Sequence, residues 1–287
     1  MRIDLHTHTT ASDGLLDAPA LVAEASARGV GLLAVSDHDT TASVDAAMEA
    51  GRGARVEVWP AVELSCDIDV GEVHVLGYFV DHRLSWFQAL LERLRDGRLH
   101  RAERMVERLA ALGAPVDFAR VAALAGGGAV GRPHVARVLV EAGWVRDLPE
   151  AFDRFIGRHG PAYVERVKLT PAEAVTIIRG AGGLAVLAHP GWGRQDALIP
   201  ALVASGLDGI EVYYPDHTPA LVAHYVALAR QHGLLVTGGT DFHGGDLATR
   251  VVVGSQYVPE EIVAPLRDAA RDRRALDTAP AVALTVE

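Results

Sequence analysis

Residues able to bind a metal ion are concentrated at the start of this chain, in the segment MRIDLHTHTTASDG. Residues two apart in a β-strand project from the same face, so His6 and His8 would lie together on one side of a first strand. Asp13 follows a few residues later. Imidazole and carboxylate groups without a thiolate suit borderline to hard divalent ions such as zinc, manganese or iron. The segment therefore indicates a metal site rather than an ordinary core strand.

The same residue types recur where later apolar runs end. They are Asp37, His38 and Asp39 after the second run, Glu63 after the third, His74 in the fourth, His189 after the fifth, and Asp241 and His243 after the last. A single histidine usually has an ordinary core or surface role, but coincidence at most of the runs is implausible. His134, in GRPHVAR, is the one candidate away from the strand ends. Together these residues predict one cluster assembled from the whole chain.

Other common chemistries lack their motifs. The lone cysteine, Cys66, has no partner for a disulfide and no thiolate motif around it. No G-x-S-x-G sequence provides a serine nucleophile, and the glycine runs AGGGAVG and GAGG lack the residues of a phosphate loop or a dinucleotide site. The histidines and acids are therefore the main candidates for chemistry.

Short apolar runs alternate with segments of helical period, which is typical of βαβ units and an α/β fold. The strand-like runs are RIDLHTH, GLLAVSDHD, VEVWPAVELS, EVHVLGYFV, GLAVLAHPG, DGIEVYY and GLLVTGGTDFHG, and the helices between them include 18–28, 172–180, 197–205 and 219–232. Thr170 and Glu173 flank Pro171 in a typical helix start. Because strand ends in a β/α barrel meet on one face, the polar residues there should converge.

Residues 81–163 interrupt this alternation with helix-like, densely charged sequence and no convincing strand. We therefore predict a barrel domain made of residues 1–80 and 164–287, with residues 81–163 as a helical insertion subdomain. Most arginines of the insertion should lie on a solvated helix surface.

The composition limits the possible partners. The chain has 287 residues, enough for a large domain, and its formal net charge of −10 argues against a broad DNA-binding surface. An anionic substrate held at one local site remains compatible with that charge. The single cysteine, the lack of a signal-like leader and the lack of a bilayer-spanning apolar stretch predict a cytoplasmic protein without a membrane partner. The oligomeric state has no signature in the sequence.

With these features the chain resembles the PHP (polymerase and histidinol phosphatase) family of metal-dependent phosphoesterases. The matching motifs run from Asp4 to Gly244 in the order DLHTHTTASDG, SDHD, AVELS, VHVLGY, GRPHVAR, LAHPG and TDFHG. The resemblance implies a distorted (β/α)7 TIM-like barrel with a trinuclear metal centre. It is strongest to a bacterial branch with a helical insertion, the 3′,5′-nucleoside bisphosphate phosphatases and 5′-to-3′ exoribonucleases. Asp13 fits that branch, since many histidinol phosphatases of the family have histidine there.

The resemblance also implies roles for individual residues. Three divalent ions (manganese, zinc or iron) would be held by His6, His8, Glu63 and Asp241, by Asp13, His38 and His243, and by Glu63, His74 and His134. Arg132 and His189 match positions that hold the substrate phosphate. The leaving alcohol could receive its proton from His189, Asp39 or a metal-bound water.

Such a centre would carry a net positive charge and attract a phosphate even in an acidic protein. A metal-bridging hydroxide would attack phosphorus in a nucleotide or short RNA and release a phosphate product. Two alternatives stay open, a small-metabolite phosphatase of the histidinol phosphate type and a non-catalytic, metal-stabilised module. Trp192, Tyr213 and Tyr214 could stack on a base or pack in the core.

Overall fold

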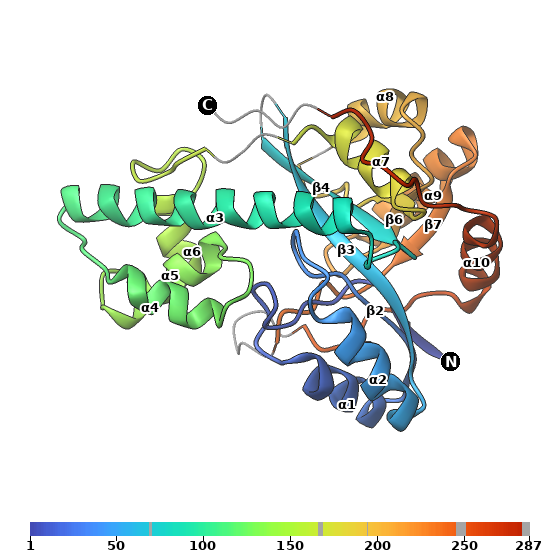
Figure 1. The fold of residues 1–287 in the computed structure, drawn as a ribbon, viewed down its shortest axis with the longest axis horizontal. Helices are drawn as coiled ribbons and strands as arrows, with labels where there is room; N and C mark the ends of the chain where they lie inside the picture. The colour runs from blue at the N-terminus through green and yellow to red at the C-terminus, as the bar shows by residue number, and fades with distance from the viewer. Residues whose placement is uncertain (69–70, 166–168, 194, 245–250, 283–287) are drawn as a thin grey trace.

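One seven-stranded sheet forms the centre of the protein (Figure 1). The computed structural model describes all residues except 69–70, 166–168, 194, 245–250 and 283–287. The strands, in the order of the chain, are β1 (Arg2–Asp4), β2 (Val30–Val35), β3 (Glu57–Ile68), β4 (Gly71–Tyr78), β5 (Leu184–Leu187), β6 (Gly209–Tyr213) and β7 (Leu235–Gly238). Each of the predicted strands is present, and most of the predicted runs continue beyond the strand as polar loops.

Strand β4 runs antiparallel to its neighbours β3 and β5, whereas the other neighbouring strands are parallel. A reversed strand presents its first residues at the edge where the parallel strands end. His74, in the first half of β4, therefore lies opposite Ser65 of β3 and close to Glu63. The sequence predicted this strand but not its direction.

The two outer strands of the sheet, β1 and β7, have no ladder between them. Isolated contacts join the two ends instead: a parallel bridge pairs Thr7 with Phe242, and the Leu5 N–H donates to the Gly238 carbonyl at 3.2 Å. The α/β class is confirmed, whereas the predicted distorted (β/α)7 barrel is not, because the sheet does not close.

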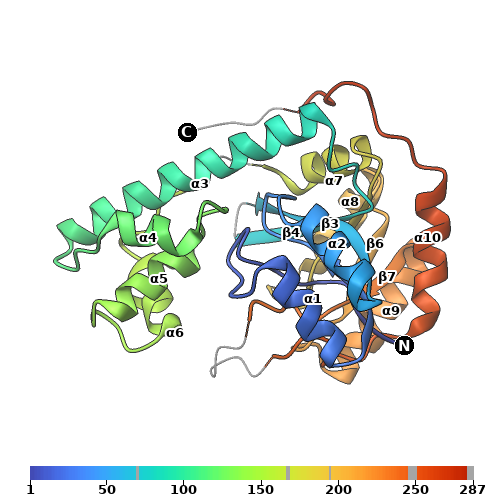
Figure 2. The same ribbon diagram turned by 60° about the horizontal axis from the view of Figure 1, so that its bottom comes forward.

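Helices surround the sheet (Figures 1 and 2). They are α1 (Ala18–Ala27), α2 (Val44–Ala54), α7 (Pro171–Gly180), α8 (Ile199–Ala204), α9 (Pro219–His232) and α10 (Val263–Arg271), with short helices η2 (Gln195–Leu198) and η3 (Glu260–Ile262). Thr170 and Glu173 form the predicted capping box of α7. Side chains such as Ile178 of α7 are fully buried against the sheet, each contributing about 1.5–3 kcal/mol. No helix of the described chain has the length and apolar character to cross a membrane.

Between β4 and α7 the chain forms a run of helices, here called the insertion. It contains α3 (Ser85–Ala111), α4 (Phe118–Ala125), α5 (Arg132–Glu141), α6 (Leu148–Ala151) and the π-helix η1 (Phe152–Ile156), and Figure 1 shows it to one side of the sheet. Helix α3 belongs to two cores: Phe87 and Leu91 pack with the sheet, whereas Met105 and Leu109 pack with α4 and α5. The division at residues 81 and 163 stays a prediction, since α3 joins both parts.

Candidate metal centre

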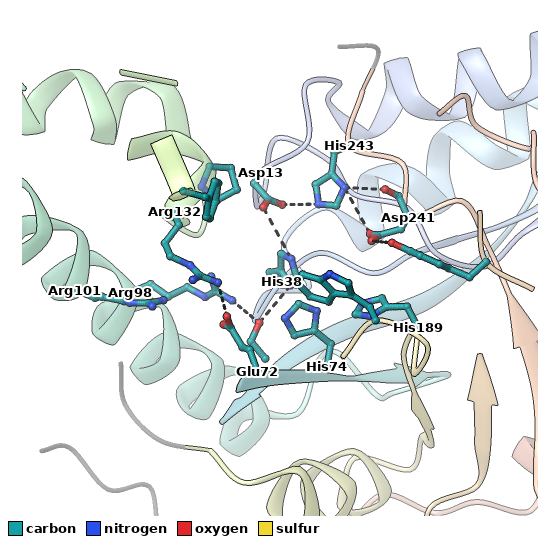
Figure 3. Close-up of a pocket in the computed structure, with 15 residues that line it drawn as sticks. Asp13, His38, Glu72, His74, Arg98, Arg101, Arg132, His189, Asp241 and His243 are labelled. Carbon is teal, nitrogen blue, oxygen red and sulfur yellow. Dashed lines mark hydrogen bonds and ion pairs between the residues drawn. The ribbon is translucent and has the colours of Figure 1, made fainter. Parts of the chain in front are cut away.

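Most of the predicted metal ligands meet at one end of the strands, although they come from distant parts of the sequence (Figure 3). They form three overlapping groups in which one donor atom of each residue lies within 4.8 Å of the others. The groups are His6, His8, Glu63 and Asp241; His8, Asp13, His38 and His243; and His38, Glu63 and His74. Every predicted metal ligand except His134 belongs to one of them.

The first group surrounds a small space with four donor atoms. His6 Nε2 lies 3.3 Å from Glu63 Oε2 and 3.2 Å from Asp241 Oδ1. His8 Nε2 lies 3.2 Å and 3.1 Å from the same two oxygens. All four atoms are buried and make no hydrogen bond within the described chain. Because buried polar atoms are almost always satisfied, this arrangement fits a cation bound between them.

The second group is centred on Asp13. Its Oδ1 lies 3.2 Å from His243 Nε2 and 3.9 Å from His8 Nδ1, and its Oδ2 lies 4.0 Å from His38 Nε2. Asp13 Oδ1 is also buried without a hydrogen bond from any described residue. This second set of imidazole and carboxylate donors therefore fits a second divalent ion.

The carboxylate of Glu63 lies between the groups. Its Oε1 is 2.9 Å from His74 Nδ1 and 3.3 Å from His189 Nε2, and its Oε2 is 3.1 Å from His38 Nδ1. Glu63 is fully buried on β3. One carboxylate that contacts donors of several groups has the geometry of the predicted bridging ligand.

His189 lies among the candidate ligands, whereas His134 lies outside their three groups. His189 reaches Glu63 beside His74, and its ring lies 5.2 Å from that of His74. His134 is outside all three groups, and its Nδ1 accepts a hydrogen bond from the Gly131 N–H at 2.9 Å. Burial lowers the pKa of His134 to about 4, so its imidazole is neutral at pH 7. The structure thus places His189, and not His134, beside the third group.

The buried charges of the site compensate one another. Burial alone would raise the pKa of Glu63, but the imidazoles of His38 and His74 hold it well below its usual range. Burial alone would lower the pKa of His8, yet Asp241 and Glu63 raise it to about 10. In His38 the effect of burial exceeds that of the carboxylates of Glu63 and Asp13, and the pKa falls to about 3. Ionised carboxylates thus face a mixture of charged and neutral imidazoles, in which divalent cations can replace protons.

Backbone strain is concentrated at this site. Asp39, His189 and Asp241 have positive φ angles of 52°, 26° and 53°. Residues other than glycine rarely adopt such angles, which persist only where the surroundings fix them. Each of the three lies where the chain leaves a strand, and the unusual backbone turns its side chain toward the cluster or the residues that support it.

Two further acids support the ligands. Glu211 on β6 accepts hydrogen bonds from Nδ1 of His6 at 3.0 Å and from the N–H of His189 at 2.8 Å. Such a carboxylate fixes the orientation and tautomer of a metal-binding imidazole. Asp37 accepts hydrogen bonds from Thr9 and Ser12, which lie in the loop between His8 and Asp13. Glu211 was not among the residues predicted from the sequence, although an acid within the apolar run GIEVYY was the available signal.

A cavity of about 380 Å³ opens beside the metal ligands (Figure 3). Three arginines of the insertion line it: Arg98 and Arg101 from α3 and Arg132 from α5, here called the arginine wall. Arg98 and Arg101 are buried, unlike the solvated arginines expected for most of the insertion. Arg132 forms an ion pair with Glu72 of β4, and its guanidinium lies 5.5 Å from the centre of the Phe152 ring. The insertion thus brings cations to the metal ligands.

Asp39, a predicted proton donor, is engaged in other contacts. Its Oδ2 accepts a hydrogen bond from Arg98 Nε at 2.6 Å, and its Oδ1 accepts one from the Ser65 N–H at 3.1 Å. Arg98 also donates to the Ser65 hydroxyl at 2.7 Å, and that hydroxyl lies 3.4 Å from His38 Nδ1. These contacts favour a positioning role for Asp39, which links the insertion to the predicted metal ligand His38.

We expect Asp39→Asn to lower the free energy of unfolding by about 3 kcal/mol, because it leaves the buried Arg98 guanidinium without a charged partner. Urea unfolding measures the change. The double variant Asp39→Asn/Arg98→Met should recover part of the loss, since no unpaired charge remains. Glu24→Gln, which breaks the exposed pair with Arg28, should change stability by less than about 1 kcal/mol. An equally small effect in Asp39→Asn contradicts the prediction.

The chain is similar over most of its length to bacterial phosphoesterases. It is 37% identical over 247 residues to the 5′-3′ exoribonuclease Rnm of Escherichia coli strain K12, covering 84% of each chain. It is 33% identical over 270 residues to the 3′,5′-nucleoside bisphosphate phosphatase of Chromobacterium violaceum, covering 90% of this chain and 92% of the relative. A phosphoribosyl 1,2-cyclic phosphate 1,2-diphosphodiesterase of Eggerthella lenta is 36% identical over 249 residues, covering 84% of this chain and 94% of the relative.

A solved structure from Bifidobacterium adolescentis, provisionally assigned as a metal-dependent phosphoesterase, superposes with a TM-score of 0.84. It is 30% identical and covers 93% of this chain and 95% of its own. No family model matches the chain.

Fold, site and relatives together define a class of enzyme, the metal-dependent phosphoesterases. The groups of imidazoles and carboxylates supply metal donors, and the arginines beside them can bind a phosphate. Within this class the chain belongs to the PHP family, as the ordered motifs and the similar bacterial enzymes agree.

Proposed function

We propose that this protein hydrolyses the phosphate ester at the 3′ oxygen of nucleotides, as a 3′,5′-nucleoside bisphosphate 3′-phosphatase and a 5′-to-3′ exoribonuclease on short RNA. Both reactions can break the same bond. Water adds to phosphorus, the bond from phosphorus to the 3′ oxygen breaks, and that oxygen takes a proton. The product is inorganic phosphate from a bisphosphate, or a shortened RNA with a 5′ phosphate. Relatives named for each reaction support this proposal.

The observation that carries the proposal is the shared cavity of the metal ligands and the arginine wall. A substrate with a single phosphate needs one anion site, which the metal groups supply. A nucleotide with phosphates at both ends, or an RNA terminus, carries a second anion that the arginine wall can bind through charge-assisted hydrogen bonds. Two adjoining cationic regions therefore favour nucleotides over a small monophosphate.

We propose three divalent ions at this site, within the distorted barrel that the family fold implies. His6, His8, Glu63 and Asp241 would hold the first, and Asp13, His38 and His243 the second. Glu63, His74 and His189 would hold the third, with His189 in place of His134. Such ions, whether manganese, zinc or iron, neutralise the phosphate oxygens and lower the pKa of bound water.

The side chains of the protein would bind and orient the substrate. Arg132 would exchange its ion pair with Glu72 for a substrate phosphate, because both anions suit the same planar donors. Tyr214 lines the cavity, and its hydroxyl donates to Asp241 Oδ2 at 3.2 Å. Burial raises the pKa of Tyr214, and Asp241 raises it further, so this phenol stays protonated at neutral pH. Tyr214 is therefore a further candidate for the group that donates a proton to the leaving 3′ oxygen.

A substrate panel tests the proposal against its alternatives. The metal-loaded enzyme should hydrolyse 3′-phosphoadenosine 5′-phosphate with a kcat/KM at least about a hundredfold above that for histidinol phosphate, because the second phosphate engages the arginine wall. The reverse preference identifies a small-metabolite phosphatase, and inactivity on every phosphate ester identifies a non-catalytic module.

The direction of RNA digestion is tested with one short RNA blocked at either end. Blocking the 3′ end should leave digestion intact, whereas blocking the 5′ end should stop it. Digestion that persists with the 5′ end blocked and stops with the 3′ end blocked shows the opposite polarity.

A further inference from the structure

The cavity at the metal ligands continues past them along helix α5. A second cavity, of about 490 Å³, shares Asp13, Pro133, Tyr214, Asp241 and His243 with the first. A third, more apolar cavity shares Arg137 and Leu148 with the second, and Phe152 and Trp192 with the first. The three cavities therefore form one groove, here called the α5 groove, which begins at the metal centre and continues along α5.

One face of α5 forms a wall of this groove. Pro133, Arg137 and Glu141 are four residues apart and line successive cavities along it. Residues four apart on a helix lie on one face, with about 6 Å between them along the axis. Arg137 therefore stands one turn farther from the metal centre than Pro133.

Most N–H donors of Arg137 make no hydrogen bond to the described residues. Its Nη2 donates to the Asp13 carbonyl at 3.1 Å, and the side chain is half-buried. In the described chain no carboxylate pairs with Arg137, whereas Arg98 and Arg132 each pair with one. A guanidinium offers five N–H donors in a plane. An anion one turn beyond the metal centre can therefore bind here without displacing an ion pair.

The apolar part of the groove suits nucleobases. Trp192 is 56% exposed, and Leu148 lies where the second and third cavities meet. Aromatic and apolar surfaces bind the faces of unpaired bases without regard to sequence. Single-stranded RNA offers both a phosphate for the cation and bases for the apolar surfaces. The groove also begins at the metal centre, where the first linkage of the RNA would be cut.

We propose that the α5 groove binds the RNA strand on the 3′ side of the cleaved linkage, with Arg137 binding the next phosphodiester. This inference rests on the proposed function and adds a strand-binding site to it. A single nucleotide bisphosphate ends at its 3′ phosphate and does not reach Arg137. The groove therefore contributes to exoribonuclease activity and much less to nucleotide hydrolysis.

Arg137→Ala tests this inference with two substrates, 3′-phosphoadenosine 5′-phosphate and a 5′-phosphorylated RNA of four nucleotides. We expect kcat/KM for the RNA to fall about tenfold more than kcat/KM for the bisphosphate, since a charge-assisted hydrogen bond is lost only for the RNA. The slope of log(kcat/KM) against log[salt] for the RNA should become shallower by about 0.7, the contribution of one phosphate contact on a single strand. Arg137→Lys, which keeps the charge, should retain part of the preference for RNA.

Arg271→Ala is the matched control, because it removes the same charge from the exposed face of α10. It should affect neither substrate. Equal losses on both substrates in Arg137→Ala would mean that the residue acts only by supporting Asp13, and unchanged rates on RNA would mean that it binds no phosphate. Either result overturns the inference while the proposed function stands. Failure of the wild-type enzyme on both substrates refutes the proposed function itself.

Discussion

The Glu63→Gln variant will lose phosphoesterase activity while its fold is retained. The carboxylate of Glu63 contacts donors from all three ligand groups, with imidazole nitrogens of His74, His38 and His8 between 2.9 and 3.2 Å away. An amide removes one negative charge and turns one oxygen into an N–H donor that repels cations and conflicts with protonated imidazoles. Because changes in the supports of metal ligands already cost tenfold to a hundredfold, we expect kcat/KM to fall by more than about a hundredfold.

Metal content and initial rates measure this effect, and far-ultraviolet circular dichroism checks the fold. Glu57→Gln is the matched control, since Glu57 is at the exposed start of the same strand and pairs with Arg267. This control should bind metal and turn over like the wild-type protein. Near-normal turnover with full metal content in Glu63→Gln would show that the carboxylate does not bridge.

The sequence was sufficient for features that depend on local patterns. Each strand is a short apolar run, so its position follows from the local pattern of apolar residues. Most of the predicted metal ligands lie where these runs end, and strand ends meet in space whatever the details of packing. The exact last residue of each strand was not needed, because His6, His38 and Asp241 were identified by residue type near the ends of the apolar runs.

Features that depend on how the insertion packs against the sheet were not predictable in this way. The position of His134 relative to Glu63 follows from the docking of α5, which no local pattern specifies. Arg98 belongs to helix α3, whose charged sequence predicts a solvated surface. Its carboxylate partner, Asp39, follows strand β2. Burying an arginine is favourable only when such a partner is present, and the partner is invisible to helical periodicity.

Removing divalent metal ions will lower the melting temperature of the protein by on the order of 10 °C. The metal-free site holds Asp13, Glu63 and Asp241 within a few ångströms of one another's imidazole partners, and several of their atoms lack any hydrogen bond from the described residues. Ions that bind the folded state alone stabilise it by about 4 kcal/mol at a thousandfold excess over Kd. Scanning calorimetry before and after chelation, with manganese or zinc then restored, measures the change.

Stabilisation by metal ions should depend on pH, because the ions compete with protons for the imidazoles. In the metal-free protein the pKa of His8 is raised to about 10, above its value of about 6.5 in the unfolded chain. The protonated imidazole therefore stabilises the metal-free fold below about pH 6.5, and that contribution is lost as the pH rises through about 10. A metal ion must displace this proton, so its affinity should rise by up to about tenfold per pH unit between pH 6.5 and 9. The difference in melting temperature between metal-loaded and metal-free protein should therefore widen with pH over that range. A metal-free protein that melts at the same temperature as the loaded one at every pH would show that the cluster does not need cations to be stable.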